Sequence, residues 1–195
     1  MSARSGLVTP LVFVVSVLAS GGCRLERPEI VPTRMIEPRL ADAPGAVADA
    51  PDAVSVRLLE TQTRGHLGRP VLHQLASGEL TEDPVWRWSS TPDRYLDSAL
   101  RLALAASSEV RLVDRSTASA LALTLLTWHL DAGASRQLVG AVELQITGVD
   151  RAIRTEVIRA SEPVSLELPG DLADAAGRLL QRLAADSLAR VRQTP

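Results

Sequence analysis

The chain has 195 residues, of which 46% are hydrophobic and 23% are charged, and its formal net charge is −2. This length suits about one domain. The composition is close to the globular average, which argues against wholesale disorder, a collagen-like repeat and a multi-span membrane protein. The slightly negative charge argues against a broadly basic nucleic-acid binder. A single cysteine excludes an intrachain disulfide and a four-cysteine zinc site.

Residues 1–22 have the pattern of a signal peptide. Arg4 supplies a positive charge, and an apolar stretch of 12 residues begins at Leu7. Such a stretch is too short to span a bilayer as a helix, but it suits the apolar region of a signal. Small residues then lead to Cys23, which resembles a bacterial lipoprotein signal whose cysteine is lipidated and becomes the new N-terminus. The alternative is a secretory signal cleaved near Ala19, with Cys23 left as a free thiol.

Residues 23–52 are expected to be a lipidated cysteine and a Pro/Ala-rich tether, preceding a folded domain over residues 53–192. The tether contains five prolines and few large apolar residues, too few to offset the entropy of ordering it. Its taut length is on the order of 100 Å, so the domain could stand well off a membrane. One exception stays open, an extended strand packed on the domain and formed by Ile30, Val31, Met35 and Ile36.

The folded domain is predicted from its hydrophobic periodicity. Strands are expected at residues 54–58, 70–75, 110–113, 121–130, 142–147 and 152–160. Apolar residues at three-and-four spacing predict two helices, the first capped by Ser90 or Thr91 and the second by Asp171. In the fourth strand, Trp128 and Leu130 are expected on the face opposite to Leu121. The order β-β-α-β-β-β-β-α predicts an α+β fold, an antiparallel sheet with two amphipathic helices packed on one face.

We expect no enzymatic activity, no cofactor and no metal site. The sequence lacks a Gly-x-Ser-x-Gly elbow, a Gly-rich phosphate loop ending in lysine and a His-Glu-x-x-His motif. Nothing in the spacing of the histidines predicts that they converge on a metal; they are His66, His73 and His129. A capping and solvation role is expected for three aspartates near the first helix, Asp83, Asp93 and Asp97.

Two tryptophans are notable because aromatic residues make up only 3% of the chain. Trp86 and Trp88 are expected in a loop just before the first helix. One interpretation is a hydrophobic plug that holds the helix to the sheet. The other is a binding surface for a partner or a lipid, because tryptophan is enriched in interface hot spots. A second candidate surface is the polar face of strand 142–147, where Glu143 is the only charged residue. A face with so little charge would allow contacts between copies of the chain, although any solvated sheet face looks similar.

The chain resembles the ABC-type transport auxiliary lipoprotein family over roughly residues 53–192. The resemblance rests on loose motifs in a fixed order together with the lipoprotein-like start. These motifs are His66-Leu67-Gly68-Arg69-Pro70-Val71, Ser77-Gly78-Glu79-Leu80, Arg87-Trp88, a helix with Leu96, Leu100 and Leu104, and Leu121-x-Leu123-x-Leu125-x-x-Trp128.

The resemblance implies a non-catalytic subunit of an MCE-type ABC lipid transport system, lipid-anchored at Cys23. Its implied partners are an MCE-domain protein with its permease and ATPase, met through Trp86 and Trp88, and the chain could form a homo-oligomer. Arg24, in place of aspartate after the cysteine, favours the periplasmic side of the outer membrane. Two alternatives stay open, an outer-membrane assembly or structural lipoprotein and a periplasmic lipid-binding chaperone, which would need an apolar cavity.

Overall fold

Nine strands and two helices make up the part of the chain that the computed structural model describes, residues 32–41, 48, 50–131, 133, 136–165 and 169–193. These residues belong to one unit, Val31–Pro195. The expected signal peptide and Cys23 lie outside the described residues. The strands are β1 (Arg34–Ile36), β2 (Val54–Leu58), β3 (Gln62–Thr63), β4 (Pro70–Gln74), β5 (Leu80–Trp88), β6 (Val110–Leu112), β7 (Ser119–Asp131), β8 (Gln137–Thr147) and β9 (Ile153–Pro163). The helices are α1 (Pro92–Ala105) and α2 (Pro169–Arg192).

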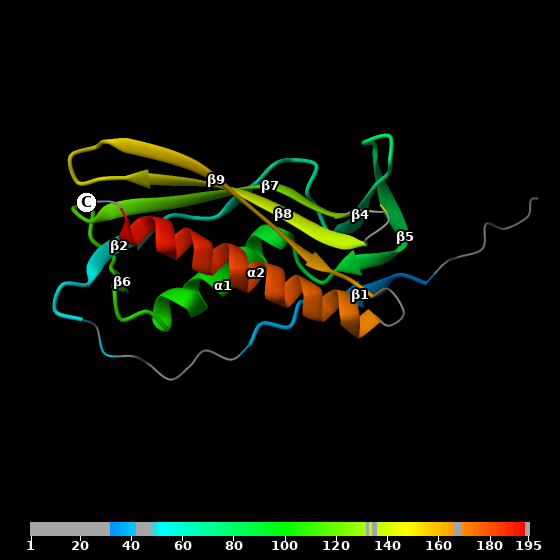
Figure 1. The fold of residues 1–195 in the computed structure, drawn as a ribbon, viewed down its shortest axis with the longest axis horizontal. Helices are drawn as coiled ribbons and strands as arrows, with labels where there is room; N and C mark the ends of the chain where they lie inside the picture. Colours follow the sequence, from blue (N-terminus) through cyan, green and yellow to red (C-terminus); the bar gives the residue numbers. More distant parts are fainter. Residues whose placement is uncertain are drawn as a thin grey trace, which may run out of the picture. The chain divides into compact units, whose positions relative to one another are not determined.

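The strands form one mixed sheet built around β7 (Figure 1). Along one edge of β7 runs β8, and β9 follows it, both antiparallel. The other edge pairs in turn with β2, β3 and β4, and all three run parallel to β7. Beyond these, β5 pairs antiparallel with β4, while β6 and β1 pair parallel with β2 and β5.

The predicted α+β fold is confirmed, whereas the expectation of a purely antiparallel sheet is wrong. The chain passes along β2, β3 and β4 in one direction. It returns to the start of β7 only after β5, α1 and β6. A long connection through a helix allows parallel pairing, which a tight hairpin does not.

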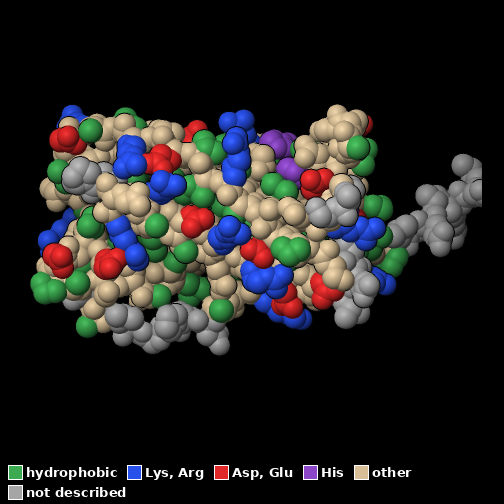
Figure 2. All heavy atoms as spheres, in the orientation of Figure 1, with side chains coloured by type: hydrophobic (Ala, Val, Ile, Leu, Met, Phe, Trp, Pro, Cys, Tyr) green, Lys and Arg blue, Asp and Glu red, His purple; other side chains and the backbone are tan. Residues whose placement is uncertain are grey.

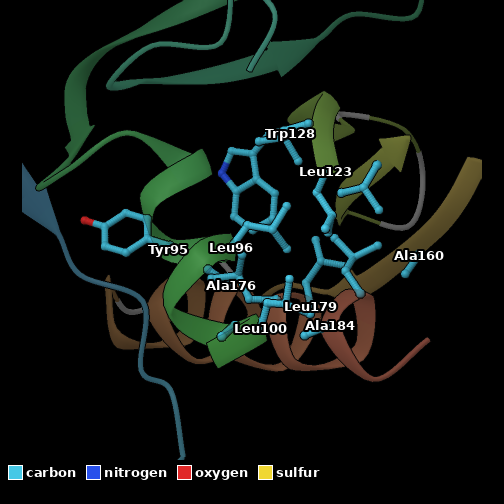
Figure 3. Close-up of a cluster of buried hydrophobic side chains, with 14 of the residues drawn as sticks. Tyr95, Leu96, Leu100, Leu123, Trp128, Ala160, Ala176, Leu179 and Ala184 are labelled. Carbon is cyan, nitrogen blue, oxygen red and sulfur yellow. The ribbon is translucent and has the colours of Figure 1, made fainter. Parts of the chain in front are cut away.

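Both helices pack on one face of this sheet and against each other. Their inward side chains recur at three-and-four spacing, and Leu96 and Leu100 of α1 and Leu179 and Leu183 of α2 have no exposed surface (Figure 3). Under α2 lies Gly140 of β8, where a Cβ would come within 3.0 Å of Leu183. This glycine therefore lets α2 lie close to the sheet.

A bulge in β7 changes which side chains face the helices. The register to β8 shifts between Leu125 and Thr127, and one extra residue reverses the alternation of a strand. Trp128 and Leu130 are therefore buried on the same face as Leu125, and Figure 3 shows Trp128 beside Leu96 of α1. The expectation that they lie on the opposite face is wrong because period-two reasoning assumes an uninterrupted strand.

The start of α1 agrees with the sequence, and the start of α2 does not. Thr91 occupies the extended N-cap position of α1, although its side chain makes no capping hydrogen bond; Pro92 follows it, and Asp93 lies in the first turn. Helix α2 already begins at Pro169, so Asp171 lies in its first turn and is not its cap. In the described part of the chain, neither helix is long and apolar enough to cross a bilayer.

Residues 32–41, here called the N-terminal arm, belong to the folded unit. The arm contains β1, which confirms an extended strand at Met35 and Ile36 and places Ile36 in the core, while Ile30 and Val31 lie outside the described residues. Farther along, the backbone N–H of Arg39 donates to the carbonyl of Ala173 in α2 (3.1 Å). The domain boundary expected at residue 53 therefore moves toward the N-terminus, because a few apolar residues suffice to dock a segment whose backbone pairs with a sheet edge.

The arm crosses α2 at a position where a side chain would not fit. A Cβ on Gly177 would lie 1.9 Å from the carbonyl oxygen of Arg39. An ion pair joins Arg39 to Asp174 at 3.0 Å. The Tyr95 hydroxyl donates to Glu37 at 3.2 Å, which ties the arm to α1 as well. Backbone, side-chain and packing contacts thus fix residues 34–39.

Candidate contact site at the Trp86 corner

Both candidate tryptophans lie in β5 and not in a loop. On β4, Pro70 pairs with Arg87 and Leu72 pairs with Glu82, so residues 83–86 bulge out of β5. The Asp83-Pro84 signal of a loop therefore marks a bulge inside a strand. The expectation of a loop is wrong because β5 pairs with β4 again after the bulge, at Arg87, and β1 pairs with this last part of β5 as well.

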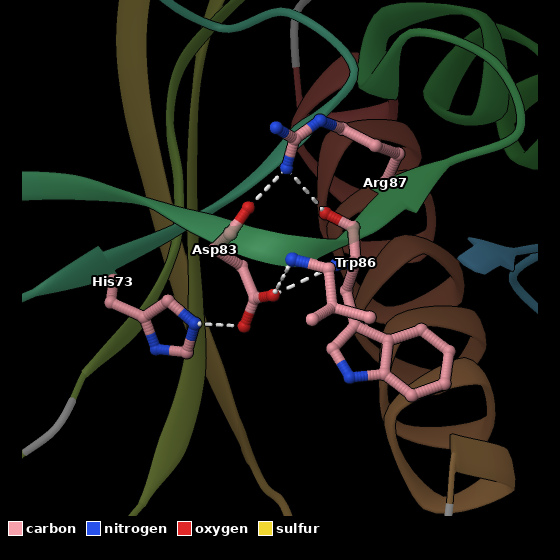
Figure 4. A network of polar contacts seen from close by, with 5 residues as sticks. His73, Asp83, Trp86 and Arg87 are labelled. Atoms are coloured by element: carbon pink, nitrogen blue, oxygen red, sulfur yellow. Dashed lines mark hydrogen bonds and ion pairs between the residues drawn. The ribbon is translucent and has the colours of Figure 1, made fainter. Parts of the chain in front are cut away.

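Asp83 holds the bulge in place (Figure 4). One carboxylate oxygen accepts hydrogen bonds from the backbone N–H groups of Val85 and Trp86, both at 2.8 Å. The other lies 2.9 Å from Nε2 of His73 on β4. The Arg87 guanidinium donates to the carbonyl oxygens of Asp83 and, at 3.0 Å, of Trp86. The Trp86 backbone is thus bonded on both sides.

The pKa of Asp83 is lowered in the fold. Burial by itself would raise this pKa. The hydrogen bonds from Trp86 and Val85 and the proximity of His73 lower it, and together they outweigh the effect of burial. The fold therefore favours the ionised carboxylate, whose contribution to stability is full above the unfolded value of about 3.9 and is lost as the pH falls through the folded pKa.

We expect the free energy of unfolding to fall as the pH drops below about 4. Asp83→Asn, which keeps an oxygen acceptor but carries no charge, should reduce this fall. Urea denaturation at a series of pH values, followed by circular dichroism, measures both slopes. An Asp83→Asn protein with the pH dependence of the wild type would contradict the assignment.

Trp88 is a core residue. Its side chain is 1% exposed, and its ring meets that of Trp128 edge to face, with centroids 5.7 Å apart. Among the described residues, the indole N–H groups of both rings find no hydrogen-bond partner. This position agrees with the plug interpretation, and it leaves Trp88 no surface with which to meet a partner.

Trp86 lies at the edge of the core, in what we call the Trp86 corner, formed by Arg34, Met35, Trp86 and Arg87. Arg34 pairs with Trp86 across β1 and β5, and its guanidinium carbon lies 5.5 Å from the Trp86 ring centroid. This is within the range of a cation–π interaction. Met35, which pairs with Arg87, is 49% exposed. The Arg87 guanidinium is already bonded to the carbonyl oxygens of Asp83 and Trp86. The corner thus presents an aromatic ring with the Arg34 guanidinium on one side of the β1–β5 pair and the Met35 thioether on the other, which suit apolar and anionic partners.

The other histidines and aspartates singled out in the sequence lie at separate places in the fold. His129 is buried in β7, and burial lowers its pKa, against an opposing effect of Asp131. Asp97 pairs with Arg101 at 2.7 Å, one helical turn away on α1. His66 lies exposed in the loop before β4. Within the described residues, no three His, Cys, Asp or Glu side chains gather as metal ligands.

Acidic and basic side chains are interspersed on the face of the molecule shown in Figure 2. Part of this pattern joins α2 to the edge strand β9, where Glu162 pairs with Arg178 at 3.3 Å and with Arg182 at 3.8 Å. In β9, Ile153 and Val157 are exposed apolar side chains, and Val157 pairs with Glu143 of β8. An apolar surface for contacts between copies would therefore include β9 as well as the Glu143 face of β8.

Sequence reasoning missed Arg34 and the pair of His73 and Asp83. The pattern of β1 had suggested that Met35 packs on the domain, but nothing in it paired Arg34 with Trp86. The Asp83-Pro84 pair indicated an interruption in the sequence. Whether that interruption is a loop or a bulge inside a strand depends on the pairing of β5 with β4.

No family model and no curated protein matches the sequence of this chain. Solved structures do share its fold. A protein of family DUF330 from Xanthomonas campestris matches with a TM-score of 0.64 at 14% identity, over 83% of this chain and 100% of the other. A hypothetical protein from Chlamydia trachomatis matches with a TM-score of 0.54 at 12% identity, over 72% and 96%.

A third structure, a minor lipoprotein from Acinetobacter baumannii, covers 71% of this chain and 92% of its own, at 14% identity and a TM-score of 0.41. That score is too low to carry an argument. The likeness to the DUF330 protein shows that both chains have the same α+β fold, and at this identity it shows the fold alone.

Proposed function

We propose that this chain is a lipoprotein, anchored by Cys23 on the periplasmic side of the outer membrane. It acts as a non-catalytic subunit of an MCE-type ABC lipid transport system. Its folded unit docks the periplasmic part of the assembly, an MCE-domain protein whose permease and ATPase belong to the inner membrane. A lipid anchor raises the local concentration of such a docking site without requiring high intrinsic affinity.

The observation that carries the proposal is that Trp86 is held in a fixed position at the edge of the sheet. Its backbone is bonded to Asp83 and Arg87 and its ring is held under Arg34, so little side-chain entropy remains to be lost on binding. Trp86 also packs against the hydrophobic core, which includes Trp88. The sequence resemblance to transport auxiliary lipoproteins and the shared fold of the DUF330 protein agree with this assignment.

Two measurements on the full chain test the proposal. Fatty-acid labelling should mark the wild type, and Cys23→Ser should leave the protein unmarked and released from the membrane fraction. In a pull-down from native membranes, the wild type should recover the three transport components. A wild type that stays unlabelled, or that recovers none of them, contradicts the proposal.

A Trp86 contact makes a further prediction for the same pull-down. Trp86→Ala should weaken binding of the partner roughly thirtyfold and reduce its recovery accordingly, since hot-spot residues contribute about 2 kcal/mol or more. The matched control is Leu112→Ala, because Leu112 is another large exposed apolar side chain, on β6. Equal recovery by both variants would place the partner contact elsewhere on the domain.

The alternatives are less well supported. A lipid chaperone needs an apolar cavity, but the described side chains between the helices and the sheet pack into one continuous core. An outer-membrane structural lipoprotein would share the anchor and the fold. It differs in the pull-down, where it would recover no transport component.

A further inference from the structure

The N-terminal arm sets how far the folded unit can stand from its anchor. Eleven Cα–Cα steps join Cys23 to Arg34, and whatever their conformation they span at most about 38 Å. The arm then pairs with β5 and bonds to α1 and α2. The stretch of sequence between Cys23 and β1 is thus much shorter than a tether that would run to residue 52.

We propose that the Trp86 corner rests against the lipid surface, with Arg34 and Met35 at the level of the headgroups. This inference rests on the proposed acylation of Cys23, and it goes further by assigning an orientation and a lipid contact. Because β1 is the outermost strand of the sheet beside β5, the strand joined to the anchor is also the strand free to approach the bilayer. A partner that docks on Trp86 is then met at the membrane surface.

The chemistry of the corner fits such a place. Met35 is half exposed and can reach the boundary between headgroups and acyl chains, while the Arg34 guanidinium can meet lipid phosphates. Tryptophan and arginine are typical of membrane–water interfaces. The acidic groups nearby are all engaged within the fold: Glu37 is bonded to Tyr95, Glu82 pairs with Arg87 at 3.7 Å, and Asp83 accepts hydrogen bonds from the backbone of Val85 and Trp86 and lies 2.9 Å from His73.

The opposite end of the sheet provides an internal reference. Val149 follows β8 at the end where β8 pairs with the start of β7, and β4 pairs with the other end of β7. Eleven residues of β8 extend about 37 Å. Val149 is 75% exposed, so a probe there samples the end of the molecule away from the corner.

Fluorescence quenching by nitroxide-labelled lipids tests the proposal. Met35→Cys and Val149→Cys each receive one thiol-reactive fluorophore in the full acylated protein, bound to vesicles of phosphatidylethanolamine and phosphatidylglycerol. Both positions are exposed, so neither change should disturb the fold. We expect the probe at residue 35 to lose most of its fluorescence and the probe at residue 149 to keep it.

The outcomes separate this inference from the proposed function. If the protein is acylated and sediments with the vesicles, but the probe at residue 35 is quenched no more than the probe at residue 149, the orientation is wrong and the anchor stands. If the protein is not acylated and does not sediment, both proposals fail.

Discussion

Replacing Trp88 by alanine is expected to lower the free energy of unfolding by about 3–5 kcal/mol. The ring is almost fully buried, and its removal takes away the edge-to-face contact with Trp128 and leaves a cavity beside α1. The lost indole N–H has no partner in the described part of the chain, so its removal relieves a small penalty and the loss should lie toward the lower end of this range. Urea denaturation of the mature chain, followed by far-ultraviolet circular dichroism, measures the change.

Two further variants make this prediction specific. Trp88→Phe keeps an aromatic ring and removes the unpartnered N–H, so it should cost clearly less than Trp88→Ala. Trp86→Ala should also cost less, because Trp86 is only partly buried at the edge of the core. If Trp86→Ala destabilised the protein as much as Trp88→Ala, the Trp86 ring would be a core element and would not serve as a mounted contact residue.

Periodicity predicted the elements that a helix or strand can specify by itself. The apolar faces of α1 and α2 follow from three-and-four spacing, and alternation places Val142, Leu144 and Ile146 of β8 in the core. Such patterns report one element against one face. They do not report which strands pair, and so the parallel pairing of β2, β3 and β4 with β7 was not predictable from them.

Bulges account for the clearest local errors. Because of the bulge before Thr127, the side chain of Trp128 lies on the face of β7 that the helices cover. The bulge at residues 83–86 interrupts β5, which pairs with β4 again at Arg87. A bulge is defined by the partner strand as much as by its own residues. For this reason the sequence could name Trp86 and Trp88 as candidates, but only the fold separates a buried plug from an edge residue under Arg34.

Gly177→Ala is expected to release the N-terminal arm. The new Cβ would lie 1.9 Å from the Arg39 carbonyl oxygen, so one of the two backbones must move. Overpacking of this kind costs about 1–3 kcal/mol, and the better helix propensity of alanine returns up to about 1 kcal/mol. The ion pair of Arg39 with Asp174 is exposed and too weak to hold the arm by itself.

Cleavage by trypsin after Arg39 measures this release. A cost of about 2 kcal/mol raises the population of the open arm roughly thirtyfold, and cleavage should accelerate in proportion. Gly170→Ala is the matched control on the same helix, because its Cβ would meet the Arg39 side chain at an ordinary 3.6 Å. Equal cleavage of both variants would show that the arm does not depend on its passage over Gly177. In the anchored protein, release of the arm also lengthens the free chain after Cys23, so the folded unit should then leave the lipid surface more readily.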